Sequence, residues 1–224
     1  MIKGTTATLA NSRTFLKAVK HLTQSDPKLA KIIQTHGAMK FSPEGEMFQS
    51  LVESILGQQL AAPAANAIIG RVKVLYANGI IDAKSLYGTP TRKLRSAGVS
   101  PQKVKYLKDL SSRVVKGKLD LELLKTKSDL ELLEALDQVL GIGSWTVHML
   151  MIFTLGRPDV LPTDDLGIRK AIQSVYSLSE MPKRDEIEEL ARNWHPYCSV
   201  ASLYLWRHKD AAAKAQRPAP KLIH

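Results

Sequence analysis

The stretch VLGIGSWT, residues 139–146, decides the fold, because two glycines flank one aliphatic residue between two helix-like segments, 129–139 and 144–155. Glycine permits a very tight turn, with Ile142 tucked into the core and the free amides of the second helix facing outward. Those amides and the positive end of the helix dipole can bind a phosphate without any side chain. A Gly-x-Gly pattern also occurs in ordinary turns between helices. The sequence therefore predicts either a plain interhelical turn or a phosphate-binding hairpin formed by Leu140, Gly141, Ile142, Gly143 and Ser144.

Apolar residues recur at steps of three and four along almost the whole chain, and no sustained apolar/polar alternation marks a half-buried strand. The chain is therefore expected to be all-α. Helices are expected at residues 12–23, 27–35, 44–56, 61–76, 90–96, 101–115, 119–124, 129–139, 144–155, 165–175, 183–193 and 196–208. Several begin with a capping signal, for example Ser128 with Glu131 three residues later. We expect residues 1–224 to form one unit of two helical lobes, with a loosely held tail at 211–224.

The chain carries 32 lysines and arginines against 21 aspartates and glutamates, a formal net charge of +11. Such a surplus favours a polyanionic partner, although surface lysine also serves solubility alone. The charge is sorted: residues 92–118 hold nine basic side chains and one acid, whereas residues 119–140 hold two basic and six acidic ones. This distribution is typical of a nucleic-acid-binding surface. A helix is expected to begin within residues 92–118, near Gly98, Ser100 and Lys103. These residues form either an ordinary capped helix start or a second phosphate contact.

A single cysteine, Cys198, excludes an internal disulfide, an all-cysteine zinc site and a cysteine-ligated iron–sulfur cluster within the chain. The six histidines show no metal-ligand spacing with one another or with acids, so neither a metal nor a cofactor is expected. The first residues lack the apolar stretch of a secretory signal, and the longest apolar run, 149–153, is too short to span a bilayer. We expect a soluble, intracellular monomer without a membrane partner.

Two adjacent carboxylates, Asp164 and Asp165, follow the hairpin in the stretch VLPTDDLGIR, residues 160–169. They fall at the expected start of a helix, where one of them can serve as the N-cap. The other is then available to point into a cleft. Beside a DNA backbone an unpaired carboxylate is electrostatically unfavourable, so its presence needs a functional reason. The pair is a candidate catalytic site.

Four motifs in this order resemble the helix-hairpin-helix DNA glycosylases, specifically the 3-methyladenine DNA glycosylase II branch and its yeast relatives. They are SILGQQL at 54–60, the hairpin, LPTDDLGI at 161–168, and WHPY at 194–197 leading to Ala201 and Leu205-Trp206. The resemblance covers residues 41–208. It implies a monofunctional glycosylase of base excision repair that flips alkylated purines, such as 3-methyladenine and 7-methylguanine, out of double-stranded DNA and hydrolyses the N-glycosidic bond. It also implies a DNA-binding cleft between the two lobes.

The resemblance assigns roles to individual residues. Asp165 takes the catalytic position, where its carboxylate would stabilise the oxocarbenium-like sugar and position the attacking water. Asp164 is then the cap of the following helix. The pocket for the cationic base is expected to be lined by Trp145, Trp206 and Met149.

The turn after the first motif matches the family's intercalating wedge, in which Gln58, Gln59, Leu60 and Ala61 enter the minor groove. Without the resemblance, a capping or bridging role between two helices suits Gln58 and Gln59 as well as the wedge role does. Trp145 stands where bifunctional relatives have a lysine, so no Schiff base with the sugar and no strand cleavage are expected. The resemblance also implies that hairpin carbonyls hold an alkali ion when DNA is bound.

Three other functions are compatible with parts of the sequence. A noncatalytic helix-hairpin-helix DNA-binding protein would keep the glycines and the basic segment but would not need Asp165. A glycosylase for oxidised or mismatched bases often has lyase activity, which Trp145 and the missing cysteine cluster argue against. A scaffold for acidic proteins would bind DNA weakly, with little salt dependence. The expected compartment is the nucleus if the organism is eukaryotic, which we favour, and otherwise the cytoplasm with the nucleoid.

Overall fold

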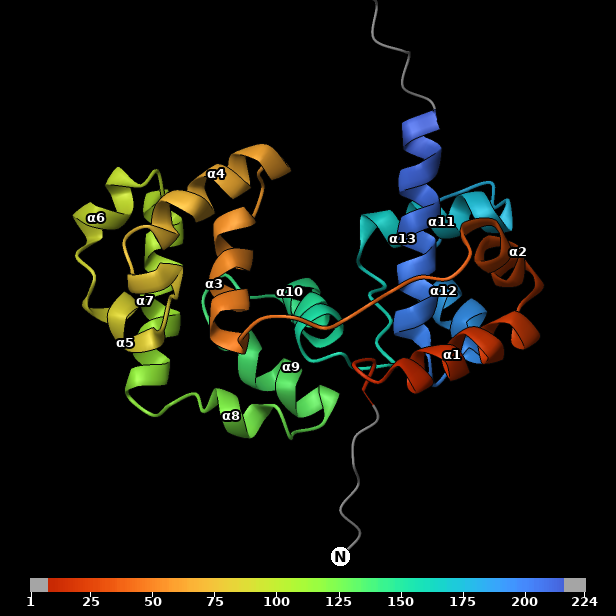
Figure 1. The fold of residues 1–224 in the computed structure, drawn as a ribbon, viewed down its shortest axis with the longest axis horizontal. Helices are drawn as coiled ribbons and strands as arrows, with labels where there is room; N and C mark the ends of the chain where they lie inside the picture. Colours follow the sequence, from red (N-terminus) through yellow and green to blue (C-terminus); the bar gives the residue numbers. More distant parts are fainter. Residues whose placement is uncertain (1–7, 216–224) are drawn as a thin grey trace, which may run out of the picture. The chain divides into compact units, whose positions relative to one another are not determined.

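The structure is a computed structural model that describes residues 8–215, and every regular element in this range is helical. The helices form two compact units (Figure 1). The central unit comprises residues 44–155, and the terminal unit combines residues 8–43 with residues 156–215. The prediction of an all-α fold is confirmed, because no strand occurs between residues 8 and 215. None of the helices in this range is both long and apolar enough to cross a bilayer.

The central unit contains the glycine hairpin. Its elements are α3 (Met47–Gly57), α4 (Ala62–Lys73), the 3-10 turn η1 (Ala77–Gly79), α5 (Ala83–Gly88), α6 (Thr91–Ser96), α7 (Pro101–Val115), α8 (Leu121–Leu124), α9 (Asp129–Asp137), α10 (Ser144–Met149) and the π-helical turn η2 (Leu150–Thr154). Ser128 and Glu131 form the predicted capping box at the start of α9. Aliphatic side chains from these helices fill the core, among them Leu51, Ile55, Leu107, Leu110, Leu132, Leu136, Val147 and Ile152.

The helix after the hairpin differs from the single long helix expected at 144–155. It passes into the π-helical turn η2, which accommodates one extra residue within the turn. This turn buries Met151 and Ile152 and leaves Phe153 exposed to solvent. Several boundaries elsewhere in the central unit also differ by a few residues, for example α4, which ends at Lys73 rather than Tyr76. An additional helix, α5, was not expected. α5 is six residues long with one buried apolar side chain, which is too few for a periodic pattern.

The terminal unit is arranged around α13 (Figure 1). Its elements are α1 (Ser12–Ser25), α2 (Pro27–His36), α11 (Leu166–Tyr176), α12 (Arg184–Leu190), the 3-10 turn η3 (Ala191–Trp194) and α13 (Cys198–Ala215). α13 packs against α1, α2 and α11, and its Ala201, Tyr204 and Leu205 are fully buried. Trp194 lies in the core, and its indole Nε1 donates to the buried Asp26 at 2.9 Å.

The end of α13 corrects one expectation. The last helix was expected to end at residue 208, but α13 continues to Ala215, and the loosely held tail from Ala211 stays a prediction. Residues 211–215 are almost entirely alanine, the residue with the highest helix propensity, so the helix extends past its packed part. The rest of the expected tail, residues 216–224, lies outside the described residues.

Candidate active site

Asp165 lies directly before α11 and is its N-cap, with extended backbone angles (φ −72°, ψ 117°). Its Oδ1 accepts the amide of Ile168 at 2.7 Å, the usual bond of a capping carboxylate. The prediction that Asp164 is the cap was therefore wrong. α11 begins at Leu166, one residue later than expected, so the cap position falls on Asp165 while Asp164 is exposed.

Trp206 binds the same carboxylate oxygen. Its indole Nε1 donates to Asp165 Oδ1 at 2.8 Å, from the helix that packs against α11. Two donors on one oxygen fix the orientation of the half-buried carboxylate. Trp206 was expected as a pocket wall, and its hydrogen bond to Asp165 was not foreseen. The only sequence signal for it is that a partly buried indole N–H usually finds an acceptor.

Gly167 provides the space in which these groups meet. A Cβ at Gly167 would lie 2.8 Å from Asp165 Oδ1, 3.2 Å from Trp206 Cδ1 and 3.1 Å from Lys209 Nζ. Gly167 has no positive φ, so the backbone conformation does not require a glycine here. The close approach of the three side chains does. The ammonium of Lys209, a residue that the sequence analysis did not single out, borders the same space and forms an ion pair with Asp210 at 3.5 Å.

Two structural features require a glycine at the first position of the hairpin, Gly141. Gly141 has a φ of 80°, the left-handed region that favours glycine. A Cβ there would also lie 2.2 Å from Cδ2 of Tyr106, so the backbone of the turn rests against an aromatic ring. Ile142 is 4% exposed, which confirms that it is tucked into the core.

The outer face of the hairpin is held by an acid. Asp109 is the only acidic residue in the basic segment 92–118, and its Oδ2 accepts the Leu140 amide at 3.0 Å. The same oxygen binds Arg113 at 2.8 Å.

Gly143 is the N-cap of α10 without a side-chain capping bond, and a Cβ there would meet nothing within 4 Å. Gly143 and Ser144 are exposed, so a phosphate can approach this part of the turn. Phosphate binding itself stays a prediction.

The wedge turn contacts the hairpin through one of its glutamines. Gln58 Nε2 donates to the carbonyl of Gly141 at 2.6 Å, so this glutamine bridges two elements. Gln59 has a φ of 57°, an uncommon value outside glycine, and it is exposed together with Leu60 and Ala61. The bridging role thus belongs to Gln58, and the three exposed residues stay candidates for the minor groove. This contact uses one of the two lone pairs of the Gly141 carbonyl oxygen, and the alkali ion implied by the resemblance stays a prediction.

The expected pocket residues lie in different units. Trp145 is 43% exposed and lines a hollow of the central unit together with residues of α3 and of the wedge turn: Ser54, Gly57, Gln58, Gln59 and Leu60. Met149 lines another hollow of the same unit, with Ser54, Thr146 and Phe153. Trp206 belongs to the terminal unit. A shared base pocket therefore stays a prediction.

The expected second phosphate contact is engaged in internal bonds. Ser100 caps α7 by accepting the Lys103 amide at 3.3 Å, and Lys103 Nζ donates to the carbonyls of Leu56 and Gln58 at 2.7 and 2.8 Å. Burial of this ammonium lowers the pKa of Lys103. A Cβ at Gly98, whose φ is 92°, would lie 2.8 Å from Arg71 Nη2. The geometry favours the capped-helix alternative, and a phosphate contact by Lys103 is left as a prediction.

Other basic residues of segment 92–118 are likewise used inside the fold. Lys108 Nζ donates to the carbonyls of Leu86, Tyr87 and Thr89 at the end of α5, and burial lowers the pKa of Lys108. Arg95 Nη1 donates to the carbonyl of Val99 at 2.6 Å. Part of the basic charge of segment 92–118 therefore serves to bind backbone carbonyls at helix ends. The residues of the segment that remain exposed without such a bond are Arg92, Lys93, Lys105, Lys116 and Lys118.

The comparisons with known proteins agree with this arrangement. Residues 52–196 match the family described as "HhH-GPD superfamily base excision DNA repair protein". DNA-3-methyladenine glycosylase 1 of Schizosaccharomyces pombe is 31% identical over 210 residues, which are 92% of this chain and 92% of the relative. A second similar protein is the DNA-3-methyladenine glycosylase of Saccharomyces cerevisiae, with 29% identity over 90% of this chain and 83% of the relative.

Solved structures give the same assignment. The S. pombe 3-methyladenine DNA glycosylase in complex with abasic DNA superposes with a TM-score of 0.78 at 32% identity, covering 87% of this chain and 97% of that one. A DNA-3-methyladenine glycosidase from Bacillus halodurans gives a TM-score of 0.79 at 35% identity, covering 88% and 91%. The chain therefore belongs to the HhH-GPD superfamily of base excision DNA repair proteins, in its 3-methyladenine DNA glycosylase branch.

Proposed function

We propose that this protein is a 3-methyladenine DNA glycosylase of base excision repair, which removes alkylated purines from double-stranded DNA by hydrolysing the N-glycosidic bond. The observation that carries the proposal is the carboxylate of Asp165, held by two donors on one oxygen at the start of α11. A structural cap needs only the first of these donors. The second, from Trp206, orients the carboxylate further, as a group that must face a reacting atom requires.

The reaction follows from the charge of the substrate. An alkylated purine such as 3-methyladenine or 7-methylguanine is cationic, so it leaves readily as a neutral base without a protonating acid. As the bond to the sugar breaks, positive charge develops on the sugar ring. The Asp165 carboxylate stabilises that charge and positions or deprotonates the attacking water. The flipped base must first leave the stack, at a cost of about a few kcal/mol that is smallest for a damaged base.

The central unit supplies features suited to holding the DNA. The exposed glycine turn around Gly143 offers backbone amides to a phosphate, which is independent of sequence. Gln59, Leu60 and Ala61 are exposed at the wedge turn, where they can occupy the space that a flipped nucleotide leaves. The bound abasic DNA of the S. pombe structure supports damaged DNA as the partner.

The protein is proposed to be monofunctional. Strand cleavage in bifunctional relatives needs a lysine amine that forms a Schiff base with the sugar, and Trp145 at that position has no such amine. Lys209 borders the space at Gly167, but it is part of α13 and not of the hairpin helix, where the bifunctional lysine stands.

The test uses duplex oligonucleotides that carry one 7-methylguanine, with released base and strand cleavage measured separately under single-turnover conditions. Asp165→Asn keeps the capping geometry and removes the charge, and we expect it to slow base release by about 100-fold or more. Asp164→Asn is the matched control, because Asp164 is the exposed neighbour, and it should release base at the wild-type rate.

Each result separates one alternative. Undiminished base release by Asp165→Asn would contradict the catalytic role of this carboxylate. DNA binding without base release from any alkylated duplex would indicate the noncatalytic module. Strand cleavage without added alkali would indicate lyase activity and contradict a monofunctional enzyme.

A further inference from the structure

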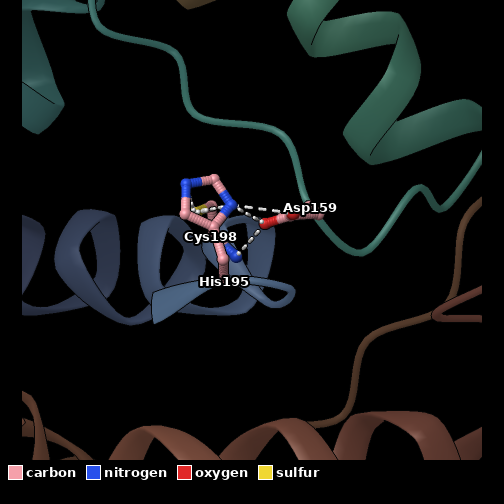
Figure 2. A group of neighbouring side chains, drawn as sticks. All are labelled: Asp159, His195 and Cys198. Carbon is pink, nitrogen blue, oxygen red and sulfur yellow. Dashed lines mark hydrogen bonds and ion pairs between the residues drawn. The ribbon is translucent and has the colours of Figure 1, made fainter. Parts of the chain in front are cut away.

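Three chemically different side chains meet on the terminal unit: Asp159, His195 and Cys198 (Figure 2). His195 Nδ1 lies 2.8 Å from Asp159 Oδ2, and Cys198 Sγ lies 3.5 Å from the same nitrogen. One carboxylate oxygen, one imidazole nitrogen and the thiol sulfur all lie within 4.8 Å of one another. The sequence analysis missed the cluster, because Asp159 is far from the other two along the chain.

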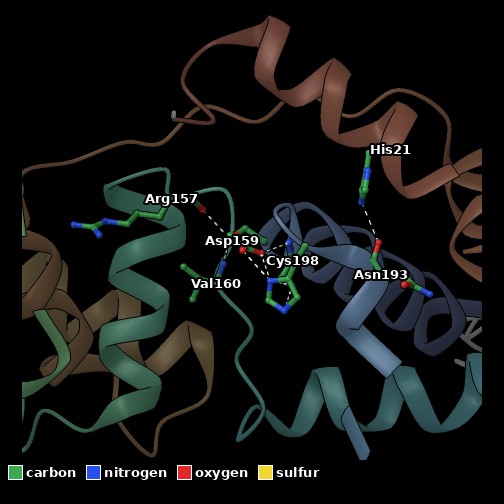
Figure 3. A network of polar contacts seen from close by, with 8 residues as sticks. His21, Arg157, Asp159, Val160, Asn193 and Cys198 are labelled. Carbon is green, nitrogen blue, oxygen red and sulfur yellow. Dashed lines mark hydrogen bonds and ion pairs between the residues drawn. The ribbon is translucent and has the colours of Figure 1, made fainter. Parts of the chain in front are cut away.

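The loop that carries Asp159 is fixed to the start of α13 on both sides of the cluster (Figure 3). Ser199 Oγ donates to the carbonyl of Arg157 at 2.7 Å and accepts the amide of Val160 at 2.9 Å. The Ser199 amide also donates to the Pro158 carbonyl at 3.0 Å. Cys198 is the next residue along, and its amide donates to Asp159 Oδ1 at 3.2 Å. The loop that carries Asp159 and the helix start that carries Cys198 are therefore held together by bonds other than the contacts within the cluster.

Access to the cluster differs between its members. Cys198 is fully buried, whereas the side chains of Asp159 and His195 are 32% and 52% exposed. The thiol thus forms the floor of the cluster, and the imidazole and carboxylate stand at its solvent side. An ion arriving from solvent meets the two exposed ligands first.

The distances suit a tetrahedral ion. Zinc binds sulfur at about 2.3 Å, imidazole nitrogen at about 2.0 Å and carboxylate oxygen at about 2.0–2.2 Å. Around a tetrahedral centre these bond lengths place nitrogen and sulfur about 3.5 Å apart and nitrogen and oxygen about 3.3 Å apart. The nitrogen–sulfur distance already has this value, and the histidine–aspartate pair needs to open by about half an ångström.

We propose that Asp159, His195 and Cys198 form a binding site for a zinc-like divalent ion, with water as the fourth ligand. Thiolate, imidazole and carboxylate are all zinc ligands, and the soft sulfur disfavours magnesium and calcium, which take oxygen ligands. The bound ion links the loop leading toward Asp165 to the start of α13, the helix that carries Trp206. Its role is to stabilise the terminal unit, and it does not depend on the proposed enzymatic function.

The test uses the untagged full chain, stripped with a chelator and titrated with Co²⁺ as a spectroscopic substitute for zinc. We expect one equivalent to bind, with a thiolate-to-metal charge-transfer band and the visible bands of a tetrahedral centre, both removed when zinc displaces the cobalt. Zinc should also raise the Tm of the stripped protein, because an ion that binds the folded state stabilises it.

Variants then locate the ion. Cys198→Ser and His195→Ala should lose the charge-transfer band and the zinc-dependent rise in Tm, and circular dichroism checks that both are folded. His36→Ala is the control, since this histidine belongs to the same unit but contacts His208 instead of the cluster. A wild-type cobalt complex without a thiolate band overturns the proposal, whether or not the variants fold. Zinc binding that Cys198→Ser leaves unchanged overturns it as well.

Discussion

The indole Nε1 of Trp206 donates a hydrogen bond to Oδ1 of Asp165 at 2.8 Å, and the same oxygen accepts the amide of Ile168 at 2.7 Å. One oxygen of the carboxylate is thus fixed both by its own helix and by a neighbouring one. The orientation of the proposed catalytic group therefore depends on how α13 packs against α11.

Trp206→Phe keeps an aromatic ring at this position but removes the donor to Asp165. A hydrogen bond to a charged group contributes about 1.5–3 kcal/mol, so the free energy of unfolding should fall by up to about this amount, and base release should slow by about 10- to 100-fold because the carboxylate loses its orienting donor. Single-turnover release of 7-methylguanine measures the effect. The control is the same substitution in the Asp165→Asn background, where it should add little, because the two residues act together. Equal effects in both backgrounds would show that Trp206 acts as a pocket wall, independently of the carboxylate.

Gly167→Ala should separate activity from stability. Alanine is favoured over glycine inside a helix by up to about 1 kcal/mol, which offsets part of the cost of displacing the capping carboxylate, so the free energy of unfolding should change by less than about 1 kcal/mol. The new methyl group would lie 2.8 Å from Asp165 Oδ1, so the carboxylate has to move and base release should fall by about tenfold or more. Gly70→Ala in α4 is the matched control, since a Cβ there meets nothing within 4 Å, and it should leave base release unchanged. Wild-type activity of Gly167→Ala would mean that the close approach has no role in catalysis.

The sequence predicts the features that depend on neighbouring residues. The hairpin could be found because Gly141, Ile142 and Gly143 are consecutive and each has its own local reason: a positive φ, burial and an exposed cap. The capping box of Ser128 and Glu131 fixed the start of α9 in the same way. The family resemblance added the candidate Asp165, which local signals alone could not separate from Asp164.

Contacts between distant residues could not be predicted from the sequence. The bond from Trp206 to Asp165 joins residues that no periodic pattern connects, and the contact from Gln58 to the Gly141 carbonyl joins two motifs of the chain. The same holds for Lys103, whose ammonium caps the end of α3 although its position in a basic segment is typical of a phosphate contact. A one-residue error in the start of α11 was enough to assign the capping role to Asp164 instead of Asp165.

The two hairpin glycines should respond differently to alanine. Gly141→Ala forces a positive φ on alanine and places a methyl group against the Tyr106 ring, so we expect a loss of about 3 kcal/mol in the free energy of unfolding. Gly143→Ala has open space and an ordinary φ, so stability should change by less than about 0.5 kcal/mol. Its methyl group stands where a phosphate approaches the turn, and DNA affinity should fall by about tenfold. Wild-type DNA affinity of Gly143→Ala would contradict a phosphate contact at this turn.

Lys103→Met tests whether this lysine holds the fold or the DNA. The variant keeps the apolar stem and removes the ammonium that binds the carbonyls of Leu56 and Gln58. We expect a loss of about 1–2 kcal/mol in stability and an unchanged salt dependence of DNA binding. Lys105→Met, at an exposed lysine of the same helix, is the control and should leave stability unchanged. A lower salt dependence with full stability would instead assign Lys103 to a phosphate.

Asp26 should be the main carboxylate through which the terminal unit responds to acid. Burial by itself raises the pKa of Asp26, but hydrogen bonds from Tyr176, Trp194 and the amides of Leu29 and Lys28 outweigh it, and the pKa lies below its ordinary value of 3.8. The stabilisation is therefore fully present above pH 3.8 and is lost as the pH falls through the lower pKa of the folded state.

Substitutions of Asp26 measure this contribution. Asp26→Ala removes the cap of α2 and leaves the buried Trp194 N–H without its acceptor, so we expect a loss of about 3 kcal/mol. Asp82→Ala removes only an exposed cap and should cost about 1 kcal/mol. In denaturant unfolding, the difference in stability between wild type and Asp26→Asn should narrow as the pH falls below 3.8, because the wild-type carboxylate then takes up a proton. A difference that stays constant from about pH 7 to about pH 3 would mean that the charge of Asp26 contributes nothing, and that its hydrogen bonds stabilise the fold equally well in the neutral form.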